Sequence, residues 1–178
     1  TVIWLPLKAD EPGGDRVDVA VQIEPAALLF LRRLRDIQLE DRRGRTVVST
    51  RLTVETISDV GAQRLCGGAH DARVSVKRLR RTVDGSEDKA VEYILFTERL
   101  KVPQGVVSRE SCDHCAGDVM QLVLAFPLVD EPDPQSIFAF LPVCPSNFSF
   151  IICADWDLTS SRQSVRYDSA LNLWLRDH

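Results

Sequence analysis

The sequence predicts an α+β protein built mostly from an antiparallel or mixed β-sheet, with a few helices, in one or two lobes. Three observations predict this class. Hydrophobic residues make up 44% of the 178-residue chain, its apolar segments are short or alternating as strands are, and Gly, Pro and Asp residues separate them. With 27% charged residues and no apolar run of about eighteen residues, the composition excludes a collagen, a coiled coil and a membrane-spanning helix.

The charge and the cysteine content bear on partners and compartment. Acidic residues exceed basic ones by 26 − 22 = 4, so no overall positive field attracts a phosphate backbone, and we expect neither a nucleic-acid nor a membrane partner. The chain starts at Thr1 without the basic and apolar regions of a signal peptide, which suggests a fragment of a longer protein. Five cysteines are an odd number for a disulfide scaffold and favour a reducing, intracellular compartment, cytoplasmic or nuclear.

The N-terminal third predicts a strand, a helix and a hairpin. Residues 2–7 form an apolar run that ends at a Pro-Gly turn, which is typical of a strand. Glu24 and Pro25 begin an amphipathic helix, because apolar residues recur behind them at helical spacing: Ala27, Phe30, Leu31 and Leu34. An alternating segment at 37–40 and a β-branched segment at 46–54 flank turn residues, so they predict a hairpin.

The remaining chain predicts further strands and a terminal helix. The glycines between residues 56 and 72 interrupt any regular period, so they predict a loop there. The turn residues Asp84 and Gly85 predict that strands at 73–83 and 91–102 form a second hairpin. Beyond a loop at 103–118, alternate residues from Met120 to Leu128 are apolar and predict a strand that packs one face on the core. We expect the runs 137–143 and 148–153 to form adjacent antiparallel strands at the centre of the sheet, and Asp168 and Ser169 to cap a helix with Leu171, Trp174 and Leu175 on one face.

Two groups of residues invite functional interpretations that the sequence does not favour. The basic residues Lys77, Arg78, Arg80 and Arg81 have no interleaved aromatic residue for base stacking, so a solvated strand face is the better interpretation. Cys112, His114 and Cys115 form a single close cluster, with Cys66 and His70 in a distant glycine loop. A structural zinc site needs two clear ligand pairs, so we expect no metal, and reduced thiols instead.

Arg162 is the strongest candidate functional residue. An apolar run that ends at Ala154 leads directly into polar residues and this arginine, which places a guanidinium just beyond a buried strand. A guanidinium is always charged and binds phosphate oxygens through two parallel hydrogen bonds, so it is suited to sense the terminal phosphate of a nucleotide. The alternative is a local ion pair with Asp155, Asp157 or Asp168.

Several motifs resemble one family. FAFLPV at 138–143, FSFIICADWDL at 148–158, SRQ at 161–163 and LNLWL at 171–175 resemble the heat-shock-protein-90-like ATPase regions of sacsin and NO VEIN type proteins. TVIWLPLK at 1–8 resembles the last strands of that family's nucleotide-binding domain, and LLFLRRLR at 28–35 the helix that follows. Two positions depart from the family pattern: Gln163 replaces a usual glutamate, and Trp156 stands at a position that is usually another aromatic residue.

The resemblance implies a division of the chain and a role for Arg162. Residues 1–44 would end a nucleotide-binding domain, and residues 45–178 would be a middle-domain-like segment. Arg162 would contact the γ-phosphate of ATP, with Ser161 beside it, and so couple nucleotide state to domain closure. ATP and Mg²⁺ would be bound by the domain N-terminal to this segment, so the segment alone would bind no cofactor and be inactive, and protein clients would be the further partners.

A second function from another class stays open. The chain would then be a non-enzymatic interaction module, and the exposed hairpin of residues 73–102 would dock a partner by adding a strand to it.

Overall fold

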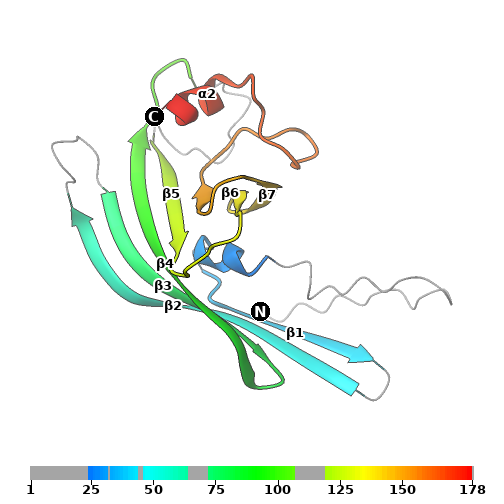
Figure 1. The fold of residues 1–178 in the computed structure, drawn as a ribbon. Helices are drawn as coiled ribbons and strands as arrows, with labels where there is room; N and C mark the ends of the chain where they lie inside the picture. The colour runs from blue at the N-terminus through cyan, green and yellow to red at the C-terminus, as the bar shows by residue number, and fades with distance from the viewer. Residues whose placement is uncertain (1–23, 32, 44–45, 64–71, 107–118, 178) are drawn as a thin grey trace.

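A computed structural model describes residues 24–31, 33–43, 46–63, 72–106 and 119–177, which form one eight-stranded mixed sheet with helices packed on it (Figure 1). The strand order is β1-β2-β3-β4-β5-β8-β6-β7, and every pairing is antiparallel except β6 with β8. The α+β prediction is therefore confirmed. The elements are η1 (Pro25–Leu29), β1 (Asp36–Arg43), β2 (Thr46–Gln63), β3 (Ala72–Val83), β4 (Ser86–Lys101), β5 (Val119–Pro127), β6 (Ser136–Ala139), β7 (Leu141–Pro145), β8 (Ile151–Cys153) and α2 (Ala170–Asp177).

The first helix begins where the sequence predicts but is shorter and of another kind. Pro25 occupies its first turn, and the segment is a five-residue 3-10 helix instead of an amphipathic α-helix. Residues 26–30 are all buried, whereas Leu34 is 43% exposed. Because η1 lies in the hollow of the bent sheet (Figure 1), it is buried on all sides instead of on one face. The predicted strand at 2–7 lies outside the described residues.

Both predicted hairpins are confirmed. In β1–β2, Arg43 pairs with Thr46, and in β3–β4, Val83 pairs with Ser86. Asp84 and Gly85 have φ angles of 49° and 81°, the left-handed conformation that a type I′ hairpin turn requires at both central positions. The Asp84 carboxylate accepts a hydrogen bond from the backbone N–H of Ser49 at 2.8 Å, so the turn is also fixed to β2.

The loop predicted at 56–72 is wrong over its first half. β2 continues to Gln63 and pairs with β3 throughout, with register shifts between Thr56 and Ser58 and between Asp59 and Gly61. β-bulges admit an extra residue without ending a strand, and glycine is common at them. Gly61, one of the glycines that indicated a loop, therefore lies at a bulge in a long, bent strand.

The C-terminal strands differ from the expected central antiparallel pair. The run 137–143 divides at Phe140, whose φ of 63° reverses the chain and makes β6 and β7 a tight hairpin. β8 inserts between β5 and β6 and runs parallel to β6, so these strands form one end of the sheet. The predicted terminal helix is confirmed as α2.

Two apolar clusters lie on opposite faces of the sheet. On the face that we call inner, Tyr93 and Leu95 of β4 and Val123 and Ala125 of β5 pack with η1. On the outer face, Leu100 and Met120 pack with Leu171 and Leu175 of α2, and Trp156 contacts this second cluster. The alternation in β5 was expected to bury the even-numbered residues, but the main core takes the odd-numbered ones, because η1 lies on that side.

Two further predictions concern the domain boundary and membrane-spanning helices. The boundary predicted between residues 44 and 45 falls between β1 and β2, which are neighbours in one sheet. The division into two domains stays a prediction. None of the helices in the described ranges is long and apolar enough to span a bilayer.

We predict that Phe138→Ala lowers the free energy of unfolding by about 3–5 kcal/mol, because a ring that is 1% exposed would leave a cavity against Phe30, 5.1 Å away between ring centroids. Phe148→Ala is the matched control, since its ring is 49% exposed, and should cost less than about 1 kcal/mol. Urea unfolding followed by circular dichroism measures both. Equal losses would contradict the assignment of Phe138 to the core.

Candidate functional site

The predicted residues Ser161 and Arg162 lie together in a closed loop after β8. Leu158 and Val165 form an antiparallel bridge that closes its base, and the backbone N–H of Thr159 donates to the carbonyl of Ser164 at 3.0 Å. The Thr159 hydroxyl lies 3.2 Å from the hydroxyls of both Ser161 and Ser164. The backbone N–H of Arg162 donates to the carbonyl of Thr159 at 2.8 Å, so the tip of the loop is itself a hydrogen-bonded turn.

Arg162 is exposed at this tip and has a left-handed backbone, with φ of 58°. For a residue with a side chain, this conformation costs about 1–2 kcal/mol and persists only where the surrounding structure holds it. Within the described ranges, the guanidinium of Arg162 makes no ion pair. Asp157 and Asp168 lie instead within 3.8 Å and 3.6 Å of the guanidinium of Arg166.

Asn172 on α2 holds the base of the loop. Its side-chain amide donates to the carbonyls of Asp157 and Arg166 at 2.7 Å and 2.8 Å, and its oxygen accepts from the backbone N–H of Asp157 at 2.9 Å. Asn172 is buried, so these three bonds are shielded from water. Both chain segments that lead to Arg162 are thus fixed to one side chain on a helix, which gives the arginine a rigid support.

We predict that Asn172→Ala lowers the free energy of unfolding by about 1–3 kcal/mol, because it leaves buried backbone groups without partners. Hydrogen exchange measured by mass spectrometry should become faster in peptides that cover residues 157–166. Asn147→Ala, at an exposed asparagine, is the control and should change neither quantity. Unchanged exchange in Asn172→Ala would show that the loop does not depend on this residue.

A cleft of about 280 Å³ opens on the inner face, beside η1. Its wall is apolar where Phe30, Leu95 and Val123 line it, and its rim carries four charged residues: Arg35, Asp59, Arg73 and Lys77. Asp59 and Arg73 form a two-pronged ion pair, with distances of 2.8 Å and 2.7 Å. We call residues 158–165 the arginine loop. None of them lines the cleft, so the cleft and the loop are separate features of the surface.

Lys77 faces the cleft from β3 and supports η1. Its ammonium group donates a hydrogen bond to the carbonyl of Leu29 at 2.5 Å, at the end of the 3-10 helix. Burial, and to a smaller extent the neighbouring charge of Arg35, lower the pKa of this lysine from its ordinary value of 10.5 to about 8, although Asp59 opposes the change. Lys77 is therefore partly deprotonated at slightly alkaline pH.

We predict that Lys77 contributes a rise in the free energy of unfolding from about pH 8 to 10.5, because the folded state releases the Lys77 proton before the unfolded state does. The raised pKa of Cys153 contributes a fall above about pH 9, but it does so equally in the wild type and in Lys77→Met. The variant lacks only the Lys77 contribution, so the free energies of unfolding of the two proteins converge toward the alkaline end. Urea titrations at several pH values measure the slopes. Lys101→Met, at an exposed lysine, should keep the wild-type slope; a wild-type slope in Lys77→Met would contradict the burial of its charge.

The other basic residues of β3 are engaged by carboxylates. Arg78 lies between Glu55 and Glu92, at 3.1 Å and 2.5 Å, and Arg80 is 2.9 Å from Glu55. Arg81 lies 3.4 Å from Asp88. The sequence predicted a solvated strand face here, and the structure divides it: Lys77 faces inward, whereas Arg78 and Arg80 form ion pairs on the outer face.

The cysteine and histidine residues considered for zinc lie outside the described residues: Cys66, His70, Cys112, His114 and Cys115. Within the described ranges, no three His, Cys, Asp or Glu side chains are grouped as a metal site requires. Cys153 lines the cleft, but burial raises the pKa of its thiol to about 12, so the thiol stays protonated at neutral pH and is a poor nucleophile.

Sequence reasoning found Arg162 but missed the residues that support the two sites. Lys77 faces inward because of the register of β3 in the sheet, and the basic pairs on either side of Leu79 do not reveal that register. Asn172 stands among apolar residues of a helix, and a polar residue at such a position is a usable indication of a buried hydrogen-bonding role.

No protein-family model matches the chain, and neither a curated protein nor a solved structure is significantly similar to it.

Proposed function

We propose that this chain is part of an ATP-dependent chaperone-like protein, in which Arg162 contacts the γ-phosphate of ATP held by another domain. The observation that carries the proposal is the exposure of Arg162 at the tip of a closed loop, with no ion pair to another described residue. A guanidinium that already forms an ion pair within its own domain would bind a phosphate only weakly. This one is held outward and keeps its charge available.

The support of the loop agrees with a role in sensing a phosphate. A catalytic charge is most effective when its position is fixed before the reaction, because no reorganisation is then needed in the transition state. The bonds of Thr159 and Asn172 supply this fixation, and the Ser161 hydroxyl stands next to the arginine as a further hydrogen-bonding group. Since Arg162 would reach ATP only when two domains dock, hydrolysis would depend on closure.

The resemblance to heat-shock-protein-90-like ATPase regions supplies the identity of the ligand. In this proposal ATP and Mg²⁺ are bound N-terminal to this segment, and protein clients are the further partners. The segment itself contributes one cation to the transition state and would be inactive alone.

We predict that Arg162→Ala in the intact protein lowers ATP turnover by about a hundredfold and leaves ATP binding nearly unchanged, as expected for loss of one transition-state donor. Steady-state turnover and equilibrium binding of labelled ATP measure the two effects. Arg176→Ala, at another exposed arginine, should leave both at the wild-type level. Normal turnover in Arg162→Ala would reject the role of Arg162.

A non-enzymatic interaction module is the second candidate, and one observation favours it. β4 pairs with β5 only from Tyr93 onward, so within the described part of the chain residues 86–91 leave one strand edge open. This segment extends past the end of β5 (Figure 1), and an extended partner strand would pair with it there. The remainder of the hairpin at 73–102 is paired on both sides by β2 and β5. A module of this kind would show no ATP turnover that depends on Arg162.

A further inference from the structure

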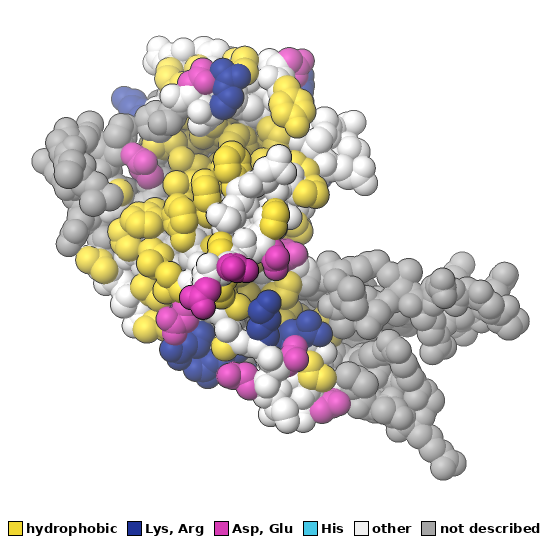
Figure 2. All heavy atoms as spheres, viewed as in Figure 1, with side chains coloured by type: hydrophobic (Ala, Val, Ile, Leu, Met, Phe, Trp, Pro, Cys, Tyr) yellow, Lys and Arg dark blue, Asp and Glu magenta, His cyan; other side chains and the backbone are white. Residues whose placement is uncertain are grey.

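The outer face of the sheet carries an apolar patch that no described element covers. We call it the outer patch and define it by six residues: Ile94 and Phe96 of β4, Leu124 and Phe126 of β5, and Phe148 and Phe150 before β8. Phe96 is 39% exposed and Phe148 is 49% exposed, and the other four residues are not fully buried. Figure 2 shows hydrophobic side chains gathered over the middle of this face.

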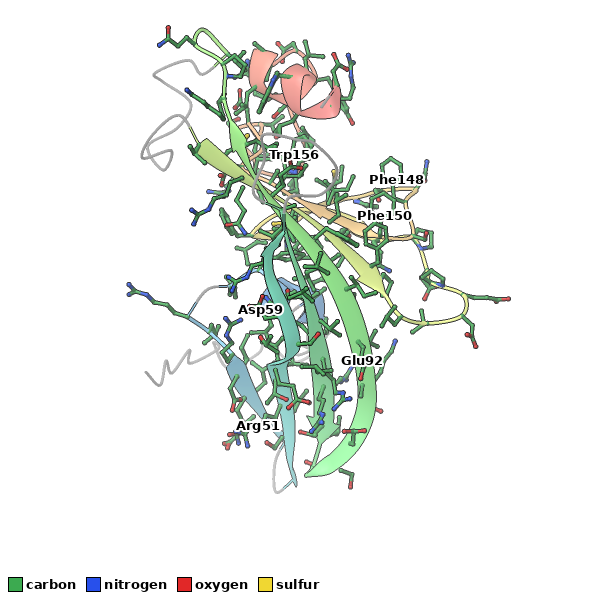
Figure 3. All side chains as sticks on the ribbon, turned by 90° about the vertical axis from the view of Figure 1, so that its left-hand side faces the viewer. Arg51, Asp59, Glu92, Phe148, Phe150 and Trp156 are labelled. Carbon is green, nitrogen blue, oxygen red and sulfur yellow. The ribbon has the colours of Figure 1, made fainter. Side chains whose placement is uncertain are left out.

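The patch is continuous and its aromatic rings are held in place. Ile94 pairs with Phe126 and Phe96 with Leu124 across neighbouring strands, so the side chains form adjoining rows. Phe126 stacks on Phe150 at 4.9 Å between ring centroids, Phe148 follows at 5.2 Å, and Phe96 meets Phe126 edge-on at 5.7 Å. Phe148 and Phe150 lie side by side in Figure 3. Fixed aromatic rings at a surface are typical of binding hot spots, because little side-chain entropy is lost when a partner covers them.

The neighbourhood of the patch indicates the shape of its partner. α2 packs against the same face of the sheet further along β4 and β5. Its Leu171 and Leu175 contact Leu100 and Met120, which lie four residues beyond Phe96 and Leu124 on these strands. A helix is thus what already covers the adjoining part of this sheet face. Helices are the usual cover for the apolar face of an open sheet, because one helical stripe buries one row of side chains.

The charge along the lower border indicates the chemistry of the partner. The segment after β5 is fixed at both ends of the patch: the N–H of Leu128 donates to the carbonyl of Glu92 at 2.8 Å, and that of Gln135 to the carbonyl of Phe148 at 2.7 Å. Between these points lie Asp130, Glu131 and Asp133, all exposed, and none of them forms an ion pair with another described residue. Acidic side chains border the hydrophobic ones in Figure 2.

We propose that the outer patch docks a basic amphipathic helix of a partner protein, whose apolar stripe covers the phenylalanines and whose Lys or Arg side chains face Asp130, Glu131 and Asp133. Contiguous apolar patches with a polar rim mark interaction sites on soluble proteins, and opposite charge at the rim selects the partner and its orientation. The nearby cations Arg78 and Arg80 do not compete, since Glu55 and Glu92 already engage them. This inference is independent of the proposed role of Arg162.

The test uses two labelled model peptides of equal length, one an amphipathic helix of Leu and Lys and the other of Leu and Glu, with fluorescence anisotropy as the measurement. The Leu-Lys peptide should bind the 178-residue chain at least about tenfold more tightly than the Leu-Glu peptide. Phe96→Ser combined with Phe148→Ser should weaken Leu-Lys binding by about tenfold or more. Ile57→Ser, at an exposed residue outside the patch, should bind as the wild type does.

A charge variant keeps the test decisive if the phenylalanine variant folds poorly. Asp130→Asn, Glu131→Gln and Asp133→Asn together alter exposed positions only, and should remove most of the preference for the Leu-Lys peptide and its salt dependence. Equal binding of the two peptides, or an unchanged preference in this charge variant, would overturn the proposal. So would a dimer, seen by analytical ultracentrifugation, that Phe148→Ser dissociates, since a second copy would then be the occupant.

Discussion

The unbroken antiparallel register between β4 and β5 decides which side chains lie on each face of the sheet. Nine consecutive residue pairs, from Tyr93 with Pro127 to Lys101 with Val119, run without a bulge. Strand residues alternate between faces, so this register sends one set of side chains to η1 and the other set toward α2 and the outer patch. A shift of one residue would exchange the two sets, and both the core and the open face would be lost.

The arginine loop depends on the same end of the sheet. β8 has only three residues, and its pairing with β5 and β6 ends where the chain turns toward Leu158. So short a strand does not by itself hold a loop in place. α2 does so through Asn172, while its apolar residues pack beside Trp156 in the second cluster, which Figure 3 places beneath the helix. The position of Arg162 is thus fixed by hydrogen bonds to a helix and not by the strand that precedes it.

Local chemistry made part of this fold predictable from the sequence. Asp84-Gly85 supplies the left-handed conformation of its turn within two residues, so the second hairpin followed from the sequence directly. The long β2 did not, because the bulge at Gly61 exists only against its partner β3. The sequence did not show which face of β5 the main core would bury, because Val123 and Ala125 interrupt the contrast with the even-numbered apolar residues and the position of η1 decides between the two faces. Arg162 was predictable as a candidate, but the sequence could not show that Arg166, and not Arg162, is the arginine that engages Asp157 and Asp168.

The bond from Lys77 to Leu29 links the segment before the first hairpin mechanically to the middle of the sheet. η1 has no side-chain hydrogen bond at its start, and its last turn presents a carbonyl to an ammonium group that is largely removed from water. A force that pulls on the chain ahead of Pro25 would be opposed at β3. Separating the Lys77 ammonium from the Leu29 carbonyl would leave a partly buried charge without its hydrogen-bond acceptor. Tension in this part of the protein is therefore carried by the third strand from the sheet's edge.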